Sequence, residues 1–117
     1  LSIEGAVKAS KRLLEHPDRP TAIFCANDEM AMGCLLEIKN HGLKVPNDIS
    51  VMGFDDIRYS AVTEPALTTI SQPAREIGER VASRLLKAIE TGHRPNNKPV
   101  ILPHELVIRD SVADISA

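Results

Sequence analysis

The chain has 117 residues, of which 43% are hydrophobic and 26% are charged, and its net charge at pH 7 is -2. This composition is ordinary for one globular domain with a core of its own, and it counts against a disordered chain. No excess of Lys and Arg indicates a nucleic-acid surface, and no apolar run approaches the roughly 20 residues of a membrane span, so we expect no membrane partner.

The first half of the chain alternates helices and strands. Apolar residues recur on one helical face over residues 3–14, and a short apolar run at 21–25 predicts a buried strand. Asn27 has the position of a helix N-cap, and the helix after it repeats apolar residues at spacings of three and four until Gly42 ends it. A second apolar strand is expected at 49–54.

The second half of the chain continues the same alternation. Residues 55–64 are polar and predict at most one helical turn, whereas the β-branched run at 67–70 predicts a third strand. Pro73 suits the first position of a long amphipathic helix that ends at Gly92, and one or two short strands follow at 100–108. Helices between strands indicate an α/β fold with a largely parallel sheet.

The cysteines and histidines give no sign of a metal centre. Cys25 and Cys34 have the spacing of neither a zinc site nor a redox motif, so we expect two reduced, buried thiols. None of the four histidines lies three or four residues from another. We therefore expect no metal and no cofactor.

Polar side chains follow each of the three predicted strands. Asn27 comes after the first strand, Asp55 after the second and Gln72 after the third. Ligands of open parallel sheets bind beyond the carboxyl ends of the strands, so these residues are expected to gather around one small molecule. Amides and carboxylates with little positive charge suit a neutral ligand rich in hydroxyl groups. Asp55 could also cap the turn after its strand, but its place after an apolar run favours a binding role.

The neighbouring residues have simpler interpretations as well. Asn27 could serve only as a helix cap, and Gln72 could make only a loop contact. Asp28 is expected to complement the helix dipole rather than bind a ligand, and Asp56 is expected to face solvent. Phe24 is one of three aromatic residues and lies near the same strand end, although core packing is an alternative role for it.

A catalytic function is another possibility for these carboxylates. Asp28 and Asp55 could form an acid–base pair or hold Mg²⁺. No nucleophile elbow, phosphate loop or Ser/His/Asp group accompanies them. The sequence therefore favours a binding protein without catalytic residues, with a small α/β enzyme using these two carboxylates as an alternative.

Several segments resemble LacI/GalR-family transcriptional regulators in order and spacing. They are Thr21–Gly33 (TAIFCANDEMAMG), Gly42–Asp56 (GLKVPNDISVMGFDD) and Glu64–Pro73 (EPALTTISQP), followed by REIGERVASRLL and PHELVIRDSVA. The resemblance covers roughly residues 18 to 113. Within the family, the sequence is most similar to the purine- and cytidine-type regulators. It implies a type I periplasmic-binding-protein-like fold, a parallel-sheet sandwich of two subdomains with an effector cleft between them, of which this chain is an incomplete, C-terminal fragment.

The resemblance also implies a division of the chain. Residues 1–71 and 100–117 correspond to the C-terminal subdomain, and residues 72–99 to a crossover and a helix of the N-terminal subdomain. The helix at 74–90 would lack the sheet it normally covers, so we expect it to pack on a neighbouring chain or to move away from its usual place.

The family's effector contacts map onto the residues that the strand ends select. Asn27, Asp55 and Gln72 correspond to effector-binding positions, and Phe24 to an aromatic that stacks on a flat ligand in some members. Ala74 stands where some members carry a large aromatic, which counts against a sugar-stacking wall there. Met32 lies on the helix that usually pairs across the dimer, with core packing as an equal alternative.

The resemblance implies the effector-sensing and dimerisation region of a cytoplasmic, LacI-type repressor. The expected partners are a nucleoside, purine or sugar effector, a second copy of the chain, and operator DNA only through a headpiece that this sequence does not include. A periplasmic sugar-binding protein of the same fold is the alternative from a neighbouring class.

Overall fold

The structure is a computed structural model, and it describes residues 1–116. The chain divides into two compact units. The first comprises Leu1–Ser71 together with the segment from Leu106 onward, and the second comprises Gln72–Glu105.

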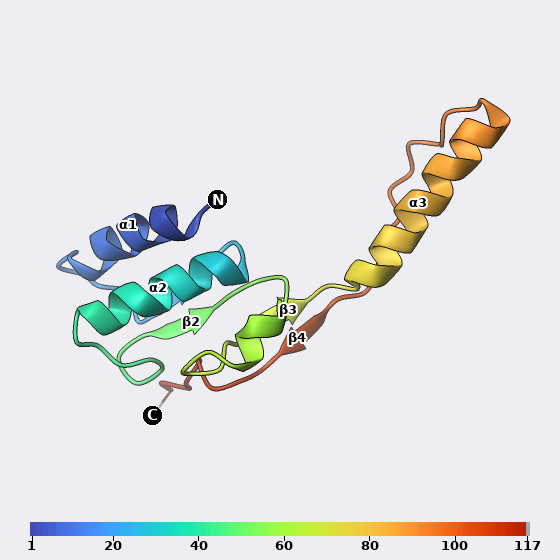
Figure 1. Cartoon of the computed structure of the whole chain (residues 1–117). Coiled ribbons are helices and arrows are strands. Elements are labelled where there is room, and N and C mark those ends of the chain that lie inside the picture. Colours follow the sequence, from blue (N-terminus) through green and yellow to red (C-terminus); the bar gives the residue numbers. More distant parts are fainter. Residues whose placement is uncertain (117) are drawn as a thin grey trace. The chain divides into compact units, whose positions relative to one another are not determined.

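Two helices form one layer of the first unit. Helix α1 spans Ile3–Leu14, and helix α2 spans Asp28–Asn40. The two helices lie side by side, and α2 packs against strand β2, which spans Ser50–Met52 (Figure 1). Gly42 follows the last turn of α2 with φ 72°, a left-handed conformation that glycine adopts without steric cost, so the predicted end of this helix is confirmed.

The strands of the first unit run in one direction. Strand β1 (Ala22–Phe24) pairs with β2 in parallel, with Ile23 opposite Val51. Isolated parallel bridges join Met52 to Thr68 and Asp55 to Ser71, and so connect β2 to strand β3 (Thr69–Ser71). Strand β3 also forms a two-stranded sheet with β4 (Glu105–Val107). The predicted α/β fold with a parallel sheet is confirmed.

The core lies between α2 and the strands, with a contribution from the end of α1. Both cysteines belong to it, and both are free thiols, as the sequence predicted. A side-chain hydrogen bond with Cys34, followed by burial, raises the pKa of Cys25, so this thiol stays protonated in the core. The buried apolar residues are Leu14, Cys25, Ala31, Cys34, Ile38, Ile49, Val51 and Leu67.

The structure confirms one predicted element and refines the start of another. The polar segment after β2 contains a single turn of 3₁₀ helix, η1 (Arg58–Ala61), as expected. Pro73 was predicted at the first position of the long helix, but it occupies the N-cap position, and the helix begins one residue later. Its ψ of 64° lies outside the helical region, which explains the difference.

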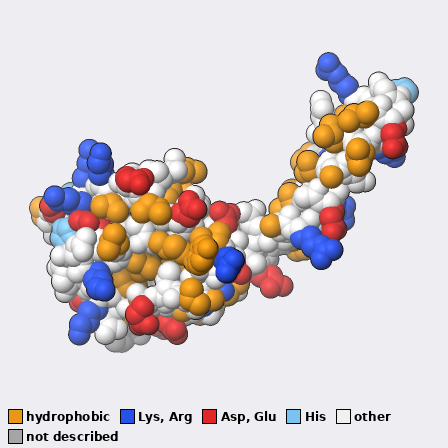
Figure 2. Space-filling view, in the orientation of Figure 1, with side chains coloured by type: hydrophobic (Ala, Val, Ile, Leu, Met, Phe, Trp, Pro, Cys, Tyr) orange, Lys and Arg blue, Asp and Glu red, His pale blue; other side chains and the backbone are white. Residues whose placement is uncertain are grey.

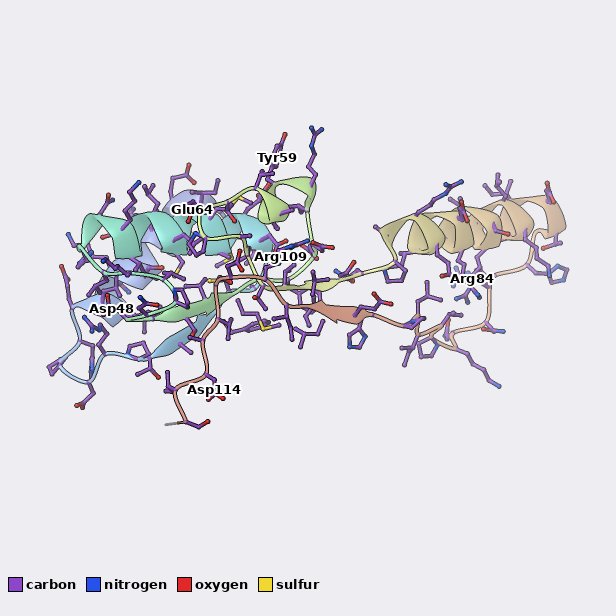
Figure 3. The ribbon with its side chains drawn as sticks, turned by 90° about the horizontal axis from the view of Figure 1, so that it is seen from below. Asp48, Tyr59, Glu64, Arg84, Arg109 and Asp114 are labelled. Carbon is purple, nitrogen blue, oxygen red and sulfur yellow. The ribbon has the colours of Figure 1, made fainter. Side chains whose placement is uncertain are left out.

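The second unit is built on helix α3, which spans Ala74–Thr91 and ends at Gly92. The chain then returns beside this helix (Figure 1), and Arg84 donates a hydrogen bond of 2.8 Å to the carbonyl oxygen of Asn96 on the returning segment (Figure 3). No residue of α3 is buried, and hydrophobic side chains are exposed along it (Figure 2). Those exposed are Ile77, Val81, Leu85, Leu86 and Ile89. Within residues 1–116, no helix is long and apolar enough to cross a membrane.

Candidate functional site

Asn27 lies between β1 and α2 and caps the helix. Its Oδ1 accepts a hydrogen bond of 2.8 Å from the backbone N–H of Met30. The cap uses only the oxygen of the amide, whereas the Nδ2 group carries two further donors. Capping and ligand binding are therefore compatible at this position, and the side chain is half-buried at the protein surface.

Asp55 lies just beyond the end of β2 and is held to β3. Its backbone N–H donates to the carbonyl oxygen of Ile70 over 2.9 Å, and it forms a parallel bridge with Ser71. Its φ of 111° and the φ of 54° at Asp56 place two successive non-glycine residues in the left-handed region. Such residues are uncommon and indicate a segment that its surroundings hold in place.

Backbone hydrogen bonds join the ends of the first two strands, including one from the N–H of Cys25 to the carbonyl oxygen of Met52 over 2.8 Å. The backbone N–H of Asp28 donates to the carbonyl oxygen of Phe54 over 2.9 Å. Asn27 immediately precedes one partner of this bond, and Asp55 immediately follows the other. Phe24, the last residue of β1, is 63% exposed and is therefore not a core residue. The structure thus places Asn27, Asp55 and Phe24 at the carboxyl ends of neighbouring strands.

Gln72 is the fourth residue that the sequence selected. It directly follows Ser71, the residue that bridges to Asp55, and it is the first residue of the second unit. Three of the selected residues therefore belong to the first unit, and Gln72 begins the other.

Asp28 has a larger structural role than the sequence indicated. Its side chain is fully buried, and its carboxylate accepts three hydrogen bonds. The donors are the backbone N–H of Ile57 at 2.9 Å, the hydroxyl of Ser60 at 2.6 Å and the hydroxyl of Thr69 at 2.6 Å. A carboxylate that is fully buried lacks the solvent access that a general base or a metal ligand needs.

The expectation that Asp56 faces solvent is wrong. Its Oδ1 accepts a hydrogen bond of 2.8 Å from the guanidinium of Arg109, and the two side chains are only 22% and 19% exposed. Arg109 (labelled in Figure 3) also donates to the carbonyl oxygen of Leu67 over 2.9 Å. The sequence analysis missed Arg109 because no local pattern connects it with Asp56. This ion pair compensates the charge of Asp56 within the protein.

Met32 lies in the second turn of α2 and is half-buried. Leu36, one turn further along the same helix, is 51% exposed. Residues four apart share a helix face, so these two side chains form one apolar stripe along α2. Its role as a dimer contact stays a prediction.

Most of the chain is similar to a known family of domains. The profile of the "Periplasmic binding protein-like domain" family matches residues 2–112. Two curated relatives are each 42% identical to the chain. The match to the HTH-type transcriptional repressor PurR of Vibrio vulnificus covers 97% of this chain and 34% of the repressor. The match to the HTH-type transcriptional repressor CytR of Escherichia coli covers 94% of this chain and 32% of the repressor. The chain thus spans about a third of the length of these relatives.

A solved structure shows the same similarity in three dimensions. The crystal structure of the Lac repressor dimer bound to operator and the anti-inducer ONPF superposes with a TM-score of 0.82 and 34% identity, over 97% of this chain and 39% of that one. The resemblance to LacI/GalR-type regulators is thereby confirmed. The chain belongs to the periplasmic binding protein-like domain family, and it corresponds in sequence and fold to the C-terminal region of LacI/GalR-type regulators.

Proposed function

We propose that this chain is the effector-sensing and dimerisation region of a LacI-type, DNA-binding transcriptional repressor. The observation that carries the proposal is the hydrogen bond from Asp28 to Phe54, because it sets Asn27 and Asp55 at adjoining ends of parallel strands. Ligands of open α/β sheets bind at this position. The similarity to repressors along nearly the whole chain supports the same function.

The chemistry of the strand ends favours a ligand with hydroxyl groups or polar ring edges. The carboxylate of Asp55 accepts hydrogen bonds from hydroxyls, and the Nδ2 of Asn27 donates. Phe24 offers an exposed aromatic face for the flat side of a base or sugar. A nucleoside, a purine or a sugar meets these requirements, and Gln72 is proposed to contribute a further polar contact.

We also propose how effector binding acts at a distance in the intact protein. We assign residues 1–71 and 100–117 to the C-terminal subdomain and residues 72–99 to the crossover and a helix of the N-terminal subdomain. The division of the chain after Ser71 and before Leu106 supports this assignment. An effector that binds both subdomains favours their closed arrangement, and by linkage it changes the affinity of the paired headpieces for operator DNA.

The intact protein is proposed to act as a cytoplasmic homodimer without enzymatic activity. The Lac repressor that superposes on this chain is a dimer bound to operator, which supports the dimer and the DNA partner. The burial of the Asp28 carboxylate counts against an acid–base pair with Asp55. In the intact protein, operator binding is proposed to take place through a DNA-binding headpiece.

Isothermal titration calorimetry of the full-length protein tests this function. The titrants are adenosine, cytidine, hypoxanthine, ribose and sucrose, which cover the three effector classes. We expect one class to bind, and we expect Asp55→Ala to weaken that binding at least tenfold, about 1.4 kcal/mol. Asp18→Ala, which removes an exposed carboxylate in the turn before β1, is the control and should leave the affinity unchanged. Equal affinity of the Asp55→Ala variant and the wild type would remove Asp55 from the site.

A further inference from the structure

Asp28 contacts both ends of the dipeptide Asp55–Asp56. Its backbone N–H donates to the carbonyl oxygen of Phe54, the residue before the dipeptide, over 2.9 Å. Its carboxylate Oδ2 accepts from the backbone N–H of Ile57, the residue after the dipeptide, also over 2.9 Å. One residue of α2 therefore fixes the chain on either side of the two aspartates.

The dipeptide needs such support because of its backbone conformation. Asp55 has φ 111° and Asp56 has φ 54°, and both angles lie in the region that residues with a side chain rarely adopt. A segment of this kind relaxes to an ordinary extended or helical conformation unless neighbouring groups hold it. Such relaxation would turn the carboxylate of Asp55 to a new direction.

A third contact connects Asp28 to strand β3. The hydroxyl of Thr69 donates to the Oδ1 of Asp28 over 2.6 Å and accepts a hydrogen bond of 3.3 Å from the backbone N–H of Asp56. The hydroxyl of Ser60 in η1 donates to Oδ2 over 2.6 Å. Asp28 therefore joins the N-terminus of α2, the segment after β2, and β3.

The approach of Asp28 to β2 depends on a glycine. A Cβ atom at Gly53 would lie 2.2 Å from the Oδ1 of Asp28, which is closer than two non-bonded atoms can approach. Since the carboxylate is fully buried, it cannot touch an effector that enters from solvent. Its influence on a ligand has to pass through the residues that it holds.

We propose that Asp28 is a positioning residue for effector binding: its buried carboxylate sets the carboxylate of Asp55 and the amide of Asn27 in fixed positions relative to each other. This inference rests on the function proposed above. Asn27 is covalently adjacent to Asp28, and Asp55 lies within the segment that Asp28 holds at both ends. The geometry of the strand ends is thus set by one ionisable group beneath the surface.

Hydrogen exchange of the ligand-free, full-length protein tests the first half of the inference. Asp28→Asn keeps the size of the side chain but replaces one acceptor oxygen by an NH₂ group, so at least one of the three donors loses its acceptor. We expect the amides of residues 54–57 to exchange at least tenfold faster, with the peptides of α1 unchanged. Equal exchange of residues 54–57 in the variant and the wild type would overturn the inference.

Ser60→Ala provides a matched control for stability. It removes one donor to the same Oδ2 but leaves the bonds to Ile57 and Thr69 in place. We expect a lower denaturation midpoint, with the exchange of residues 54–57 and the affinity for the probe within twofold of the wild type. If Ser60→Ala and Asp28→Asn change exchange and affinity equally, the role of Asp28 is only structural.

Affinity measured in a double-mutant cycle tests the second half. The probe is whichever of adenosine, cytidine, hypoxanthine, ribose or sucrose the wild type binds. Asp28→Asn should weaken it at least tenfold in the wild type, but less than twofold in an Asp55→Ala background, because Asp28 acts through Asp55. A full tenfold loss in both backgrounds would contradict this. A wild-type protein that binds none of the probes counts against the proposed function, and the exchange data still decide whether Asp28 holds residues 54–57.

A second pair of variants keeps the inference testable if Asp28→Asn does not fold. Thr69→Val removes the hydroxyl between Asp28 and Asp56 at nearly constant volume, and Thr69→Ser restores it. We expect the amides of residues 54–57 to exchange tenfold faster in Thr69→Val than in the wild type. In Thr69→Ser, their exchange rates should be within twofold of the wild type. Failure of Thr69→Ser to restore slow exchange would show that packing, rather than the hydroxyl, holds the segment.

Discussion

The guanidinium of Arg109 and the carboxylate of Asp56 form a 2.8 Å ion pair across 53 positions of the chain. Arg109 also donates to the carbonyl oxygen of Leu67, so it fixes the segment after β2 and the entry to β3 from one side. Both side chains are about one-fifth exposed. Water therefore screens this pair less than an ion pair on the open surface.

Replacement of Arg109 should lower the stability of the protein in proportion to the hydrogen bonds lost. Arg109→Met leaves Asp56 half-buried without its cation, and we expect a loss of about 2 kcal/mol in the free energy of unfolding. Arg109→Lys keeps the charge, but a lysine lacks the planar guanidinium that donates to both Asp56 and Leu67. We expect this variant to lose about 1 kcal/mol in the free energy of unfolding. Urea denaturation measures both values.

A double-mutant cycle between Arg109→Met and Asp56→Asn isolates the pair itself. We expect a coupling of about 1 kcal/mol or more. The control is the pair Arg75–Glu79 on α3, whose side chains are 93% and 64% exposed and should couple by less than about 0.5 kcal/mol. Equal coupling energies for the two pairs would mean that burial does not strengthen the Arg109 contact.

Gly53→Ala should destabilise the protein because the position has no room for a methyl group. The added Cβ would lie 2.2 Å from the Oδ1 of Asp28 and 3.1 Å from a methyl group of Leu67. Either the buried carboxylate or the strand has to move, and we expect a loss of about 3 kcal/mol in urea denaturation.

The same substitution at Gly78 serves as the control for Gly53→Ala. Gly78 is in the interior of α3, and apart from its chain neighbours and the adjacent helix backbone no atom would lie within 4 Å of its Cβ. Alanine favours the helical conformation over glycine by roughly 0.5–1 kcal/mol, so Gly78→Ala should stabilise α3 and slightly raise its helix content. Circular dichroism checks this gain. A stability loss at Gly53 no greater than the change at Gly78 would argue against close packing at Asp28.

Asn27→Asp separates helix capping from ligand binding. Aspartate caps a helix as well as asparagine does, so the free energy of unfolding should change by less than about 0.5 kcal/mol. The substitution removes the two donors on Nδ2 and adds a negative charge near Asp55, so the affinity for the effector should fall at least tenfold. Calorimetry measures the affinity for the effector, and urea denaturation of the same protein preparation measures the free energy of unfolding. An unchanged affinity would reduce Asn27 to a cap.

Met32→Lys tests the proposed pairing through α2. A charge on the apolar stripe of Met32 and Leu36 should raise the dissociation constant of the dimer at least tenfold, because an unpaired charge is costly to bury in an interface. Sedimentation velocity of the full-length protein measures it. Leu13→Lys places the same charge on an exposed position of α1 and should leave the dimer intact. Dimers of equal strength in the two variants would remove Met32 from the interface.

The elements of this fold could be read from the sequence because their signals are local. Asn27 as a cap, Gly42 in the left-handed conformation, and the parallel order of the first three strands all follow from residue types at short spacing. The same rules placed Asn27 and Asp55 at neighbouring strand ends. Whether they bind an effector stays a prediction.

The contacts beneath the strand ends could not be predicted because their partners are distant in sequence. The donors to the carboxylate of Asp28 lie 29, 32 and 41 positions away, and no periodic pattern connects them. Asp28 therefore had the appearance of a residue that only complements the helix dipole. Asp56 was misjudged for the same reason, since an aspartate in a polar loop gives no sign of an arginine 53 positions later.

Ser111 lies fully buried between two strands that are distant from it in sequence. Its hydroxyl donates to the carbonyl oxygen of Val51 over 2.6 Å and accepts from the N–H of Thr68 over 2.8 Å, and its own carbonyl accepts from the N–H of Val51. During synthesis, Val51 in β2 and Thr68, the residue before β3, therefore lack these partners until Ser111 has left the ribosome. The region around β2 and the start of β3 is therefore expected to complete its hydrogen bonds only after Ser111 has been synthesised.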